Sequence, residues 1–351
     1  MLLNEWPGIY CLSKGYVGAW LANEIAATPY SVHRVASIYK LMRNKLMRNP
    51  EGQTMAADAG CSALFAGLAT IDLMYVVDEL PRRNEKVSVP GQQITSGGPA
   101  ANAAITFAAL GGSSTLVTAI GEHALGAVVR EEMQRFSIAV HDIAHGQTAL
   151  PPVSSILVLR ATGERTVLSA NAAAFPPLSF QFDPRWLEGA SLLLVDGHYM
   201  PLCINAARLA RSRNMRVILD SGSWKHDMAS LLPYVDIAIC SDDFRPPDCR
   251  DDADALEFLS RAGIARVAIT RGAAPIRYRQ DGVEGEISIE QVRARDTLGA
   301  GDIFHGAFCF STCRGCTFID ALKFAAQVAT FSCRHIGTRD WIERLPGLRA
   351  T

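Results

Sequence analysis

The most informative segment of the chain reads Asp296-Thr297-Leu298-Gly299-Ala300-Gly301-Asp302 and runs into an apolar stretch at residues 303–308. The small residues at 299–301 leave backbone N–H groups free at a predicted helix start, where the helix macrodipole also attracts an anion. Asp302 adds a carboxylate to this anion site. That makes chemical sense if the anion is a phosphoryl group in transfer and Asp302 accepts the proton of the attacking hydroxyl. The alternative is that Asp302 only complements the helix dipole. The Walker phosphate-binding pattern is absent from the sequence.

A second glycine-rich turn precedes another predicted helix. Gly97 and Gly98 lead into Pro99, which suits the first turn of a helix, and Gly111 suits the position just after its end. Paired glycines allow a ligand to approach the backbone closely, and Asn102 in the first helical turn can direct its amide at the same ligand. The alternative is that the glycines only turn the chain before a tightly packed helix of small residues.

From about Cys61 onward, short apolar runs alternate with segments of helical period. The expected strands lie at residues 63–68, 114–120, 191–195, 216–219, 235–240 and 266–270, and expected helices lie at 202–213 and 253–262. Nearly continuous apolar strands separated by helices predict an α/β protein with a mainly parallel sheet covered on both faces. Ligands of such sheets bind beyond the carboxyl ends of the strands. Polar residues at these ends are Asp72, Asp196, Asp220, Ser241 and Thr270.

Two segments, 75–96 and 153–169, read as alternating, half-polar strands with turn residues between them. Strands of this kind form small sheets with one wet face. Together they would make a lid over the ends of the main strands, the alternative being two ordinary surface hairpins.

The first 60 residues show no strand–helix rhythm, and residues 31–50 are basic without any acid. Three interpretations remain open: a targeting peptide, a helical appendage that packs on a partner, or a start codon assigned too early, with Met55 as the natural start. The last interpretation predicts that residues 1–54 make few contacts with the sheet.

Composition narrows the class of protein. The 351 residues carry a net charge of −1, with 49% hydrophobic and 20% charged residues, which argues against a nucleic-acid-binding surface and against disorder. No apolar run is long enough to span a membrane. Nine cysteines, an odd number, argue against a disulfide framework and favour reduced thiols in the cytoplasm. The CxxC spacing of Cys313 and Cys316 is interpreted as incidental.

The two glycine-rich turns resemble the signatures of the PfkB-type, ribokinase-like carbohydrate kinases, over about 290 residues from Cys61 to the end of the chain. Within that family, Gly-Gly-Pro-Ala-Ala and Gly-Asp-Ile-Phe-His-Gly-Ala are most similar to bacterial sulfofructose kinases. The resemblance implies a three-layer α/β/α fold with a small β lid, through which relatives often form homodimers. It also implies ATP as co-substrate, Mg²⁺, and K⁺ as a further cation.

The resemblance implies roles for particular residues. Asp302 matches the catalytic base, and Gly299, Ala300 and Gly301 match the anion hole. The residues that match sugar contacts are Asp72, Gly97, Gly98 and Asn102. The residues assigned to ATP are Ser241, Thr270, Arg271, Gly272, Ala273 and Gly337. Asp296 matches a ligand of the monovalent cation.

Some positions depart from the family pattern. The Asn-x-x-Glu motif associated with Mg²⁺ would fall at residues 241–244, where the chain has Ser241 and Phe244. Asp242 or Asp243 would then hold Mg²⁺ through water, since Mg²⁺ commonly keeps several waters. Pro99 and Ala100 replace the Lys-Gly of ribose-specific relatives, which makes ribose a weaker candidate.

Two further side chains are candidates for contact with the substrate. Arg165, on the predicted lid, would bind an anionic substituent of the sugar or would be a solvated hairpin residue. His305 would touch substrate or simply pack on its helix.

The sequence thus predicts an ATP-dependent sugar kinase that phosphorylates a hydroxymethyl group of a ribose-, fructose- or sulfofructose-like sugar, with no nucleic-acid or membrane partner. The alternatives are a nucleoside kinase of the same fold and a non-catalytic sugar-binding regulator. Arg271 would help to stabilise the transferring charge.

Overall fold

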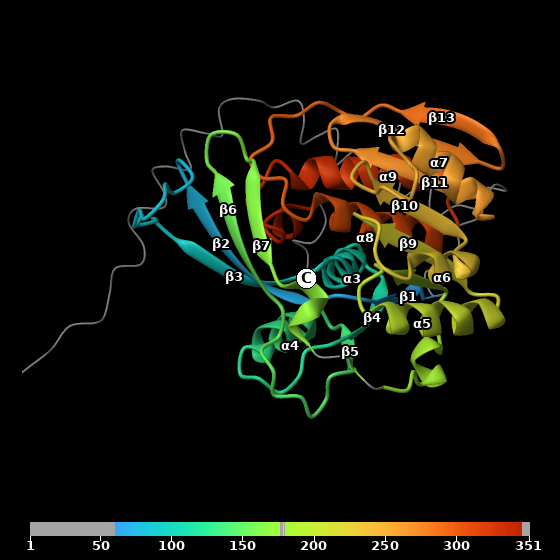
Figure 1. Ribbon diagram of the computed structural model, residues 1–351, viewed down its shortest axis with the longest axis horizontal. Helices are drawn as coiled ribbons and strands as arrows, with labels where there is room; N and C mark the ends of the chain where they lie inside the picture. The colour runs from blue at the N-terminus through green and yellow to red at the C-terminus, as the bar shows by residue number, and fades with distance from the viewer. Residues whose placement is uncertain (1–59, 176–177, 179, 346–351) are drawn as a thin grey trace, which may run out of the picture. The chain divides into compact units, whose positions relative to one another are not determined.

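A nine-stranded sheet runs through the computed structural model, which describes residues 60–175, 178 and 180–345 (Figure 1). Its strand order is β13-β12-β11-β10-β9-β8-β1-β4-β5. Seven neighbouring strands of this sheet are mutually parallel: β5, β4, β1, β8, β9, β10 and β11. Strands β12 and β13 extend the sheet as an antiparallel edge. The bounds are β1 Ser62–Ala66, β4 Ser113–Thr118, β5 Ala139–Asp142, β8 Leu192–Val195, β9 Arg216–Ser221, β10 Ile237–Ser241, β11 Arg266–Arg271, β12 Ala274–Gln280 and β13 Val283–Ile287. The predicted mainly parallel sheet is confirmed.

Helices cover both faces of this sheet. One face carries α3 (Pro99–Ala109), α8 (Ala300–Cys313) and α9 (Phe318–Ser332), and the other carries α5 (Met200–Ser212), α6 (Met228–Leu231) and α7 (Asp252–Arg261). Adjacent residues of β1 show the alternation: Phe65 stacks edge-on against Phe107 of α3, whereas Leu64 joins the core under α5. Helix α4 (Gly126–Arg135) packs near β5 and near a second, four-stranded sheet that is described below. Short 3₁₀ turns lie at Asn171–Ala174, Pro184–Leu187, Leu232–Tyr234 and Ile342–Arg344.

Close packing of α3 on α8 brings the two glycine-rich turns together. A Cβ added to Gly306 of α8 would lie 2.4 Å from the carbonyl oxygen of Ala103 in α3, so only glycine permits this approach. Half of the buried residues of α3 are alanines, whose small side chains keep the two helices near one another. The N-termini of α3 and α8 therefore open at the same edge of the sheet.

A separate four-stranded sheet, in the order β3-β2-β6-β7, contains the two alternating segments (Figure 1, left). Its strands are β2 Thr70–Val77, β3 Gln92–Gly97, β6 Val153–Leu159 and β7 Arg165–Ser169. Strand β2 begins at Thr70, earlier than the sequence indicated, so Asp72 lies within it. Ile94, Val167 and Leu168 expose much of their apolar surface on this sheet. In the described part of the chain, no helix is both long and apolar enough to cross a membrane.

Cys61 and Cys313 form a disulfide with their Cα atoms 5.7 Å apart. The prediction of reduced thiols is therefore wrong for this pair, and the cytoplasmic location that rested on it stays a prediction. The pairing joins residues 252 positions apart, at the start of β1 and the end of α8, so only the packing of α8 on the sheet brings them together. The predicted N-terminal extension, residues 1–60, lies outside the described residues except for Gly60.

Candidate active site

The N-terminus of α8 is the centre of the candidate site. Gly299 caps the helix with φ 66°, a left-handed conformation that favours glycine. A Cβ at this position would lie 2.7 Å from Cγ2 of Thr338, 3.5 Å from Nδ2 of Asn102 and 3.7 Å from Oδ2 of Asp302. The predicted anion turn thus lies against the predicted base and the predicted sugar ligand. Within the turn, Ala300 donates a long hydrogen bond of 3.3 Å to the Thr297 carbonyl.

Asp302 and Asn102, 200 residues apart in the chain, are hydrogen-bonded. Nδ2 of Asn102 donates to Oδ2 of Asp302 over 2.7 Å. Burial of the carboxyl group and the nearby charge of Asp220 raise the pKa of Asp302 to about 7, while the Asn102 hydrogen bond and the charge of His305 act in the opposite direction. A carboxylate with a pKa near neutrality is a stronger base than an ordinary aspartate, so this group is able to accept a proton from a hydroxyl.

The Asn102 amide is oriented by a residue that the sequence analysis missed. Arg339 donates to Oδ1 of Asn102 over 2.9 Å, and because a guanidinium cannot accept, the amide must turn its NH₂ towards Asp302. Arg339 also donates to the Ser96 carbonyl and pairs with Glu132 over 2.7 Å. Burial opposes ionisation of Glu132, but the charge of Arg339 and hydrogen bonds from Ser96 hold its pKa below the usual value. Because these residues lie far apart in sequence, no local motif could have identified them.

Asp72 lies beside the glycine-rich turn at Gly97 and Gly98, as predicted. Thr70 donates to its Oδ1 over 2.7 Å, and β2 and β3 pair so that Thr70 faces Gly97. A Cβ on Gly97 would fall 2.0 Å from Oδ2 of Asp72, so the glycine makes room for this carboxylate. Burial raises the pKa of Asp72, and hydrogen bonds from Thr70 and Ser154 partly offset that effect. The charge of Asp72 also reaches Asp302.

Gly98 caps α3 with φ 91°, and a Cβ there would lie 2.5 Å from the Leu68 carbonyl oxygen. The N-terminus of α3 is held from below by Asp196, whose Oδ2 accepts from the Ala100 and Leu68 backbone N–H groups. His198 N–H donates to its Oδ1. The buried Asp196 thus positions α3 through its backbone.

Asp296 and Gly337 are joined directly. The buried Asp296 accepts from the Gly337 N–H through Oδ2 (2.7 Å) and from the Leu298 N–H through Oδ1 (2.8 Å). The predicted cation ligand and one predicted ATP residue therefore share one corner, next to the anion turn.

The other predicted nucleotide residues follow neighbouring strands. Ser241 ends β10 and pairs in register with Thr270 of β11. Asp242 and Asp243 are exposed in the turn after β10, at the carboxyl edge of the sheet. Gly272 turns the chain with φ 59° between β11 and β12, followed by Ala273.

Arg271 is engaged away from Asp302. It pairs with Asp252 at 3.3 Å and with Glu286 at 3.1 Å, and it donates to the Pro275 carbonyl. These contacts assign the guanidinium to the β11–β12 edge, so its predicted part in charge stabilisation has no support from the contacts.

Phe244, at the position expected for Glu, is fully buried, with its ring 5.7 Å from that of Trp224. The altered motif therefore contributes to the core.

Arg165 bridges the second sheet to the loop before the anion turn. Its guanidinium donates to the Thr297 carbonyl over 2.8 Å and to the Thr297 hydroxyl over 2.6 Å. The guanidinium is thus held by the protein itself, and these contacts give no support to binding of an anionic sugar substituent.

His305 is buried and bonds to backbone carbonyls, so it packs on its helix and does not line the substrate side.

A metal centre made by protein ligands alone is not found in the described ranges, where no group of three or more His, Cys, Asp or Glu side chains could hold an ion.

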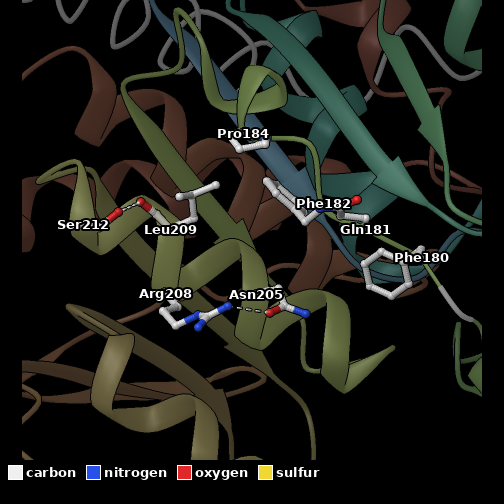
Figure 2. Close-up of a pocket in the computed structure, with 8 residues that line it drawn as sticks. All are labelled: Phe180, Gln181, Phe182, Pro184, Asn205, Arg208, Leu209 and Ser212. Atoms are coloured by element: carbon white, nitrogen blue, oxygen red, sulfur yellow. Dashed lines mark hydrogen bonds between the residues drawn. The ribbon is translucent and has the colours of Figure 1, made fainter.

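Figure 2 shows a cavity of about 510 Å³ lined by Phe180, Phe182 and Pro184 and, on α5, by Asn205, Arg208 and Leu209. Its lining has no carboxylate or histidine and none of the predicted site residues, so we do not assign the chemistry to it.

The chain is similar to known carbohydrate kinases. The profile described as pfkB family carbohydrate kinase matches residues 62–344. A ribokinase of Arabidopsis thaliana is 26% identical over 303 residues, covering 81% of this chain and 78% of the relative. A ketohexokinase of Mus musculus is 23% identical, covering 77% of this chain and 95% of the relative. The structure of Arabidopsis thaliana ribokinase complexed with ribose and ATP superposes with a TM-score of 0.64 at 20% identity, covering 81% of this chain and 97% of that one.

Proposed function

The chain belongs to the pfkB family of carbohydrate kinases, which are phosphotransferases with an alcohol group as acceptor, and on that premise we propose that it transfers the γ-phosphoryl group of ATP to a hydroxymethyl group of a sugar. One observation carries the proposal. The Asp302 carboxylate, with a pKa raised to about 7, lies in the first turn of α8 and is bonded to Asn102 at the start of α3. A base and an anion site thus meet where phosphoryl transfer requires both.

The chemical step follows from this arrangement. Asp302 takes the proton of the sugar hydroxyl as the hydroxyl oxygen forms its bond to the γ-phosphorus, and the bond from that phosphorus to the β–γ bridging oxygen breaks, which releases ADP. The N–H groups of Gly299, Ala300 and Gly301, with the positive end of the α8 dipole, stabilise the charge on the transferring phosphoryl oxygens.

The sugar is proposed to lie between the second sheet and the start of α3. Asp72 would accept hydrogen bonds from its hydroxyls, with Gly97 and Gly98 providing close backbone approach and the Asn102 amide beside the base. The buried Asp72 carboxylate keeps acceptor capacity beyond its bond to Thr70, which suits a polyhydroxylated ligand.

ATP is proposed to lie along the carboxyl edge of β10 and β11. Ser241, Thr270, Arg271, Gly272 and Ala273 would flank it, with Gly337 near the anion turn.

The residues proposed to bind Mg²⁺ and K⁺ suit these two cations to different degrees. The exposed carboxylates of Asp242 and Asp243 suit Mg²⁺ held through water, and bound Mg²⁺ would neutralise phosphate charge. Asp296 already accepts two backbone hydrogen bonds, so only its remaining lone pairs would serve K⁺.

The second sheet is proposed to act as a lid that excludes water, so that ATP is not hydrolysed. Arg165 ties this sheet to Thr297, beside the anion turn. The exposed apolar side chains of the second sheet, Ile94, Val167 and Leu168, suit a homodimer formed through the lid. We further propose that the protein acts on a free sugar in the cytoplasm and has no nucleic-acid or membrane partner.

The relatives and the candidate site support some sugars more than others as the proposed substrate. Ribokinase and ketohexokinase among the relatives support a ribose-like or fructose-like sugar. A sulfofructose-like sugar needs a cation for its anionic group, and Arg165 is engaged with Thr297. Neutral pentoses and ketohexoses are therefore our first candidates.

The test is an ADP-release assay with Mg²⁺–ATP and a panel of ribose, fructose, sulfofructose and nucleosides, run in parallel on Asp302→Asn. Phosphorylation of one sugar, lost in the variant, supports the proposal. Phosphorylation of nucleosides alone would make the chain a nucleoside kinase. Sugar binding by calorimetry without turnover would make it a regulator.

A further inference from the structure

His305 lies on α8 directly after the turn that carries Asp302, and both of its ring nitrogens face oxygen atoms. Nδ1 is 2.7 Å from the Gly301 carbonyl oxygen and 3.3 Å from Oδ2 of Asp220, and Nε2 is 3.0 Å from the Ile239 carbonyl oxygen. The side chain is only 4% exposed, so water does not compete for these positions.

The partners determine the protonation state of the ring. The Gly301 and Ile239 carbonyl oxygens can only accept hydrogen bonds, so each contact requires a donating ring nitrogen, and an imidazole carries two N–H groups only as the imidazolium. Asp220, at the end of β9, supplies the opposite charge and is itself only 7% exposed. Its Oδ2 has no hydrogen-bond partner by distance and angle among the described residues, which leaves it facing the ring as a counter-ion.

We propose that Asp220 and His305 form a buried carboxylate–imidazolium pair that holds the Gly301 carbonyl beneath the anion turn and tunes the proton affinity of Asp302. Neither residue touches substrate in this scheme, so both are positioning residues. The inference rests on the proposed function of Asp302 as the base.

The charges around Asp302 determine in which direction each neighbouring group shifts its pKa. Facing Asp302 are Asp220 from β9, His305 from α8, Asp72 from β2 and the Asn102 amide from α3, behind which Arg339 lies. The negative charge of Asp220 raises the pKa of Asp302, and the positive charge of His305 lowers it.

Asp220 has charged neighbours of its own. Burial raises the pKa of Asp220, and its charged neighbours besides His305 are Asp196, directly after β8, and Lys225, from the loop after β9. Asp196 raises the pKa of Asp220 and Lys225 lowers it, and His305, with Nδ1 3.3 Å from Oδ2, lowers it more than Lys225 does.

Removing Asp220 or His305, one at a time, must therefore shift the pKa of Asp302 in opposite directions. Asp220→Asn leaves the imidazolium and lowers the pKa of Asp302, so the acid limb of the profile of kcat/KM against pH moves to lower pH. His305→Gln leaves the carboxylate of Asp220, so the limb moves to higher pH. We expect shifts of about one unit, which change the relative rate on the acid side by up to about tenfold.

The profiles are measured with limiting sugar and saturating Mg²⁺–ATP, so that titration of ATP is common to all proteins. His141→Gln is the matched control: His141 also has a carboxylate neighbour, Asp183, but lies on the edge strand β5 and stacks on Trp186. Its acid limb should stay in place. If both test variants shift in the same direction, or neither shifts while the wild type is active, the inference is overturned and the proposed function stands.

A second readout does not depend on activity. In protein labelled with ¹⁵N-histidine, both nitrogens of His305 should give imidazolium signals at pH 7.5, assigned by their loss in His305→Gln. His141 should be neutral in the same spectrum, because burial lowers its pKa. A neutral tautomer of His305 would refute the pair, even if no sugar on the panel is phosphorylated and the proposed function fails.

Discussion

Asp302 is the residue on which the chemistry depends, and its setting differs from that of a helix-capping aspartate. A surface aspartate at a helix N-terminus has its ionised form stabilised by the dipole. Here burial and the charge of Asp220 outweigh the dipole and raise the pKa of Asp302 to about 7. The group therefore carries a proton easily and gives it up easily near neutrality, as a general base requires.

Asp302→Asn keeps the shape and removes the base. We expect kcat to fall by at least about 10²-fold, the lower end of the general-base range, while sugar affinity changes little because Asp72 and Asn102 remain. A folded variant that keeps more than about a tenth of the wild-type kcat would remove Asp302 from the mechanism.

The same substitution has a pH signature in stability. A carboxyl whose pKa is about 7 in the fold and near 3.9 when unfolded stabilises the fold fully below pH 4, and this contribution is lost as pH rises through 7. The amide of the variant does not titrate. Its Tm relative to wild type should therefore be higher at pH 8 than at pH 5, and an equal difference at both pH values would show that Asp302 is ionised throughout.

Arg339 is predicted to act through Asn102. Arg339→Lys keeps the charge but loses the fork that reaches Asn102, Ser96 and Glu132 together, so the amide is free to turn over. We expect kcat to fall about tenfold or more, with a smaller change in KM, in steady-state kinetics. Arg135→Lys, on an exposed arginine of α4, is the control and should match wild type. Unchanged kcat in Arg339→Lys would assign Arg339 to stability alone.

At the scale of elements, the contact between α3 and α8 places Asn102 against Asp302. Gly306→Ala puts a Cβ 2.4 Å from the Ala103 carbonyl oxygen, so the helices must separate. Overpacking of this kind costs about 1–3 kcal/mol, and it should lower kcat because the Asn102–Asp302 bond lengthens. Denaturant unfolding and kinetics on the same protein check both effects. Gly91→Ala, where a Cβ meets open space, is the control. Equal behaviour of the two variants would contradict this account.

The second sheet meets the anion turn through Arg165. The sequence suggests that Arg165→Ala raises KM for an anionic sugar far more than for a neutral one. The bonds to Thr297 predict instead a similar loss of kcat/KM for both sugars, since the variant loosens the attachment of the sheet. Arg160→Ala, which breaks an exposed pair with Asp78 on the same sheet, should have little effect. A loss confined to anionic sugars would return Arg165 to the substrate pocket.

At the scale of the whole molecule, the described residues between 60 and 344 belong to one structural unit that contains every residue of the candidate site. The first described strand begins at Ser62. We expect a protein that starts at Met55 to fold and to retain full kcat. Circular dichroism, melting temperature and kinetics of the two lengths provide the comparison. A loss of solubility or rate in the shorter protein would show that the first 54 residues are part of the fold.

The sequence by itself determined the class of fold and the chemical centre. Apolar strands such as residues 191–195 and 266–270 report burial on both faces, which is a local property of a parallel sheet. The small residues at 299–301 and the carboxylate of Asp302 also lie within one turn, so their role can be predicted from the local sequence. Asp72, Gly97 and Asn102 were assigned through resemblance, and the structure places all three beside Asp302 or one another.

Only the tertiary structure decided which distant side chains complete the site. Glu132 and Arg339 are 207 positions apart, and Asp220 of β9 meets His305 of α8, which packs on the sheet. The Cys61–Cys313 disulfide and the contact of Arg165 with Thr297 were likewise absent from any local pattern. The physical reason is common to all four pairs. A charge, a thiol or a guanidinium has no periodicity of its own, and its partner is selected by the packing of helices and strands that bring it within hydrogen-bond distance.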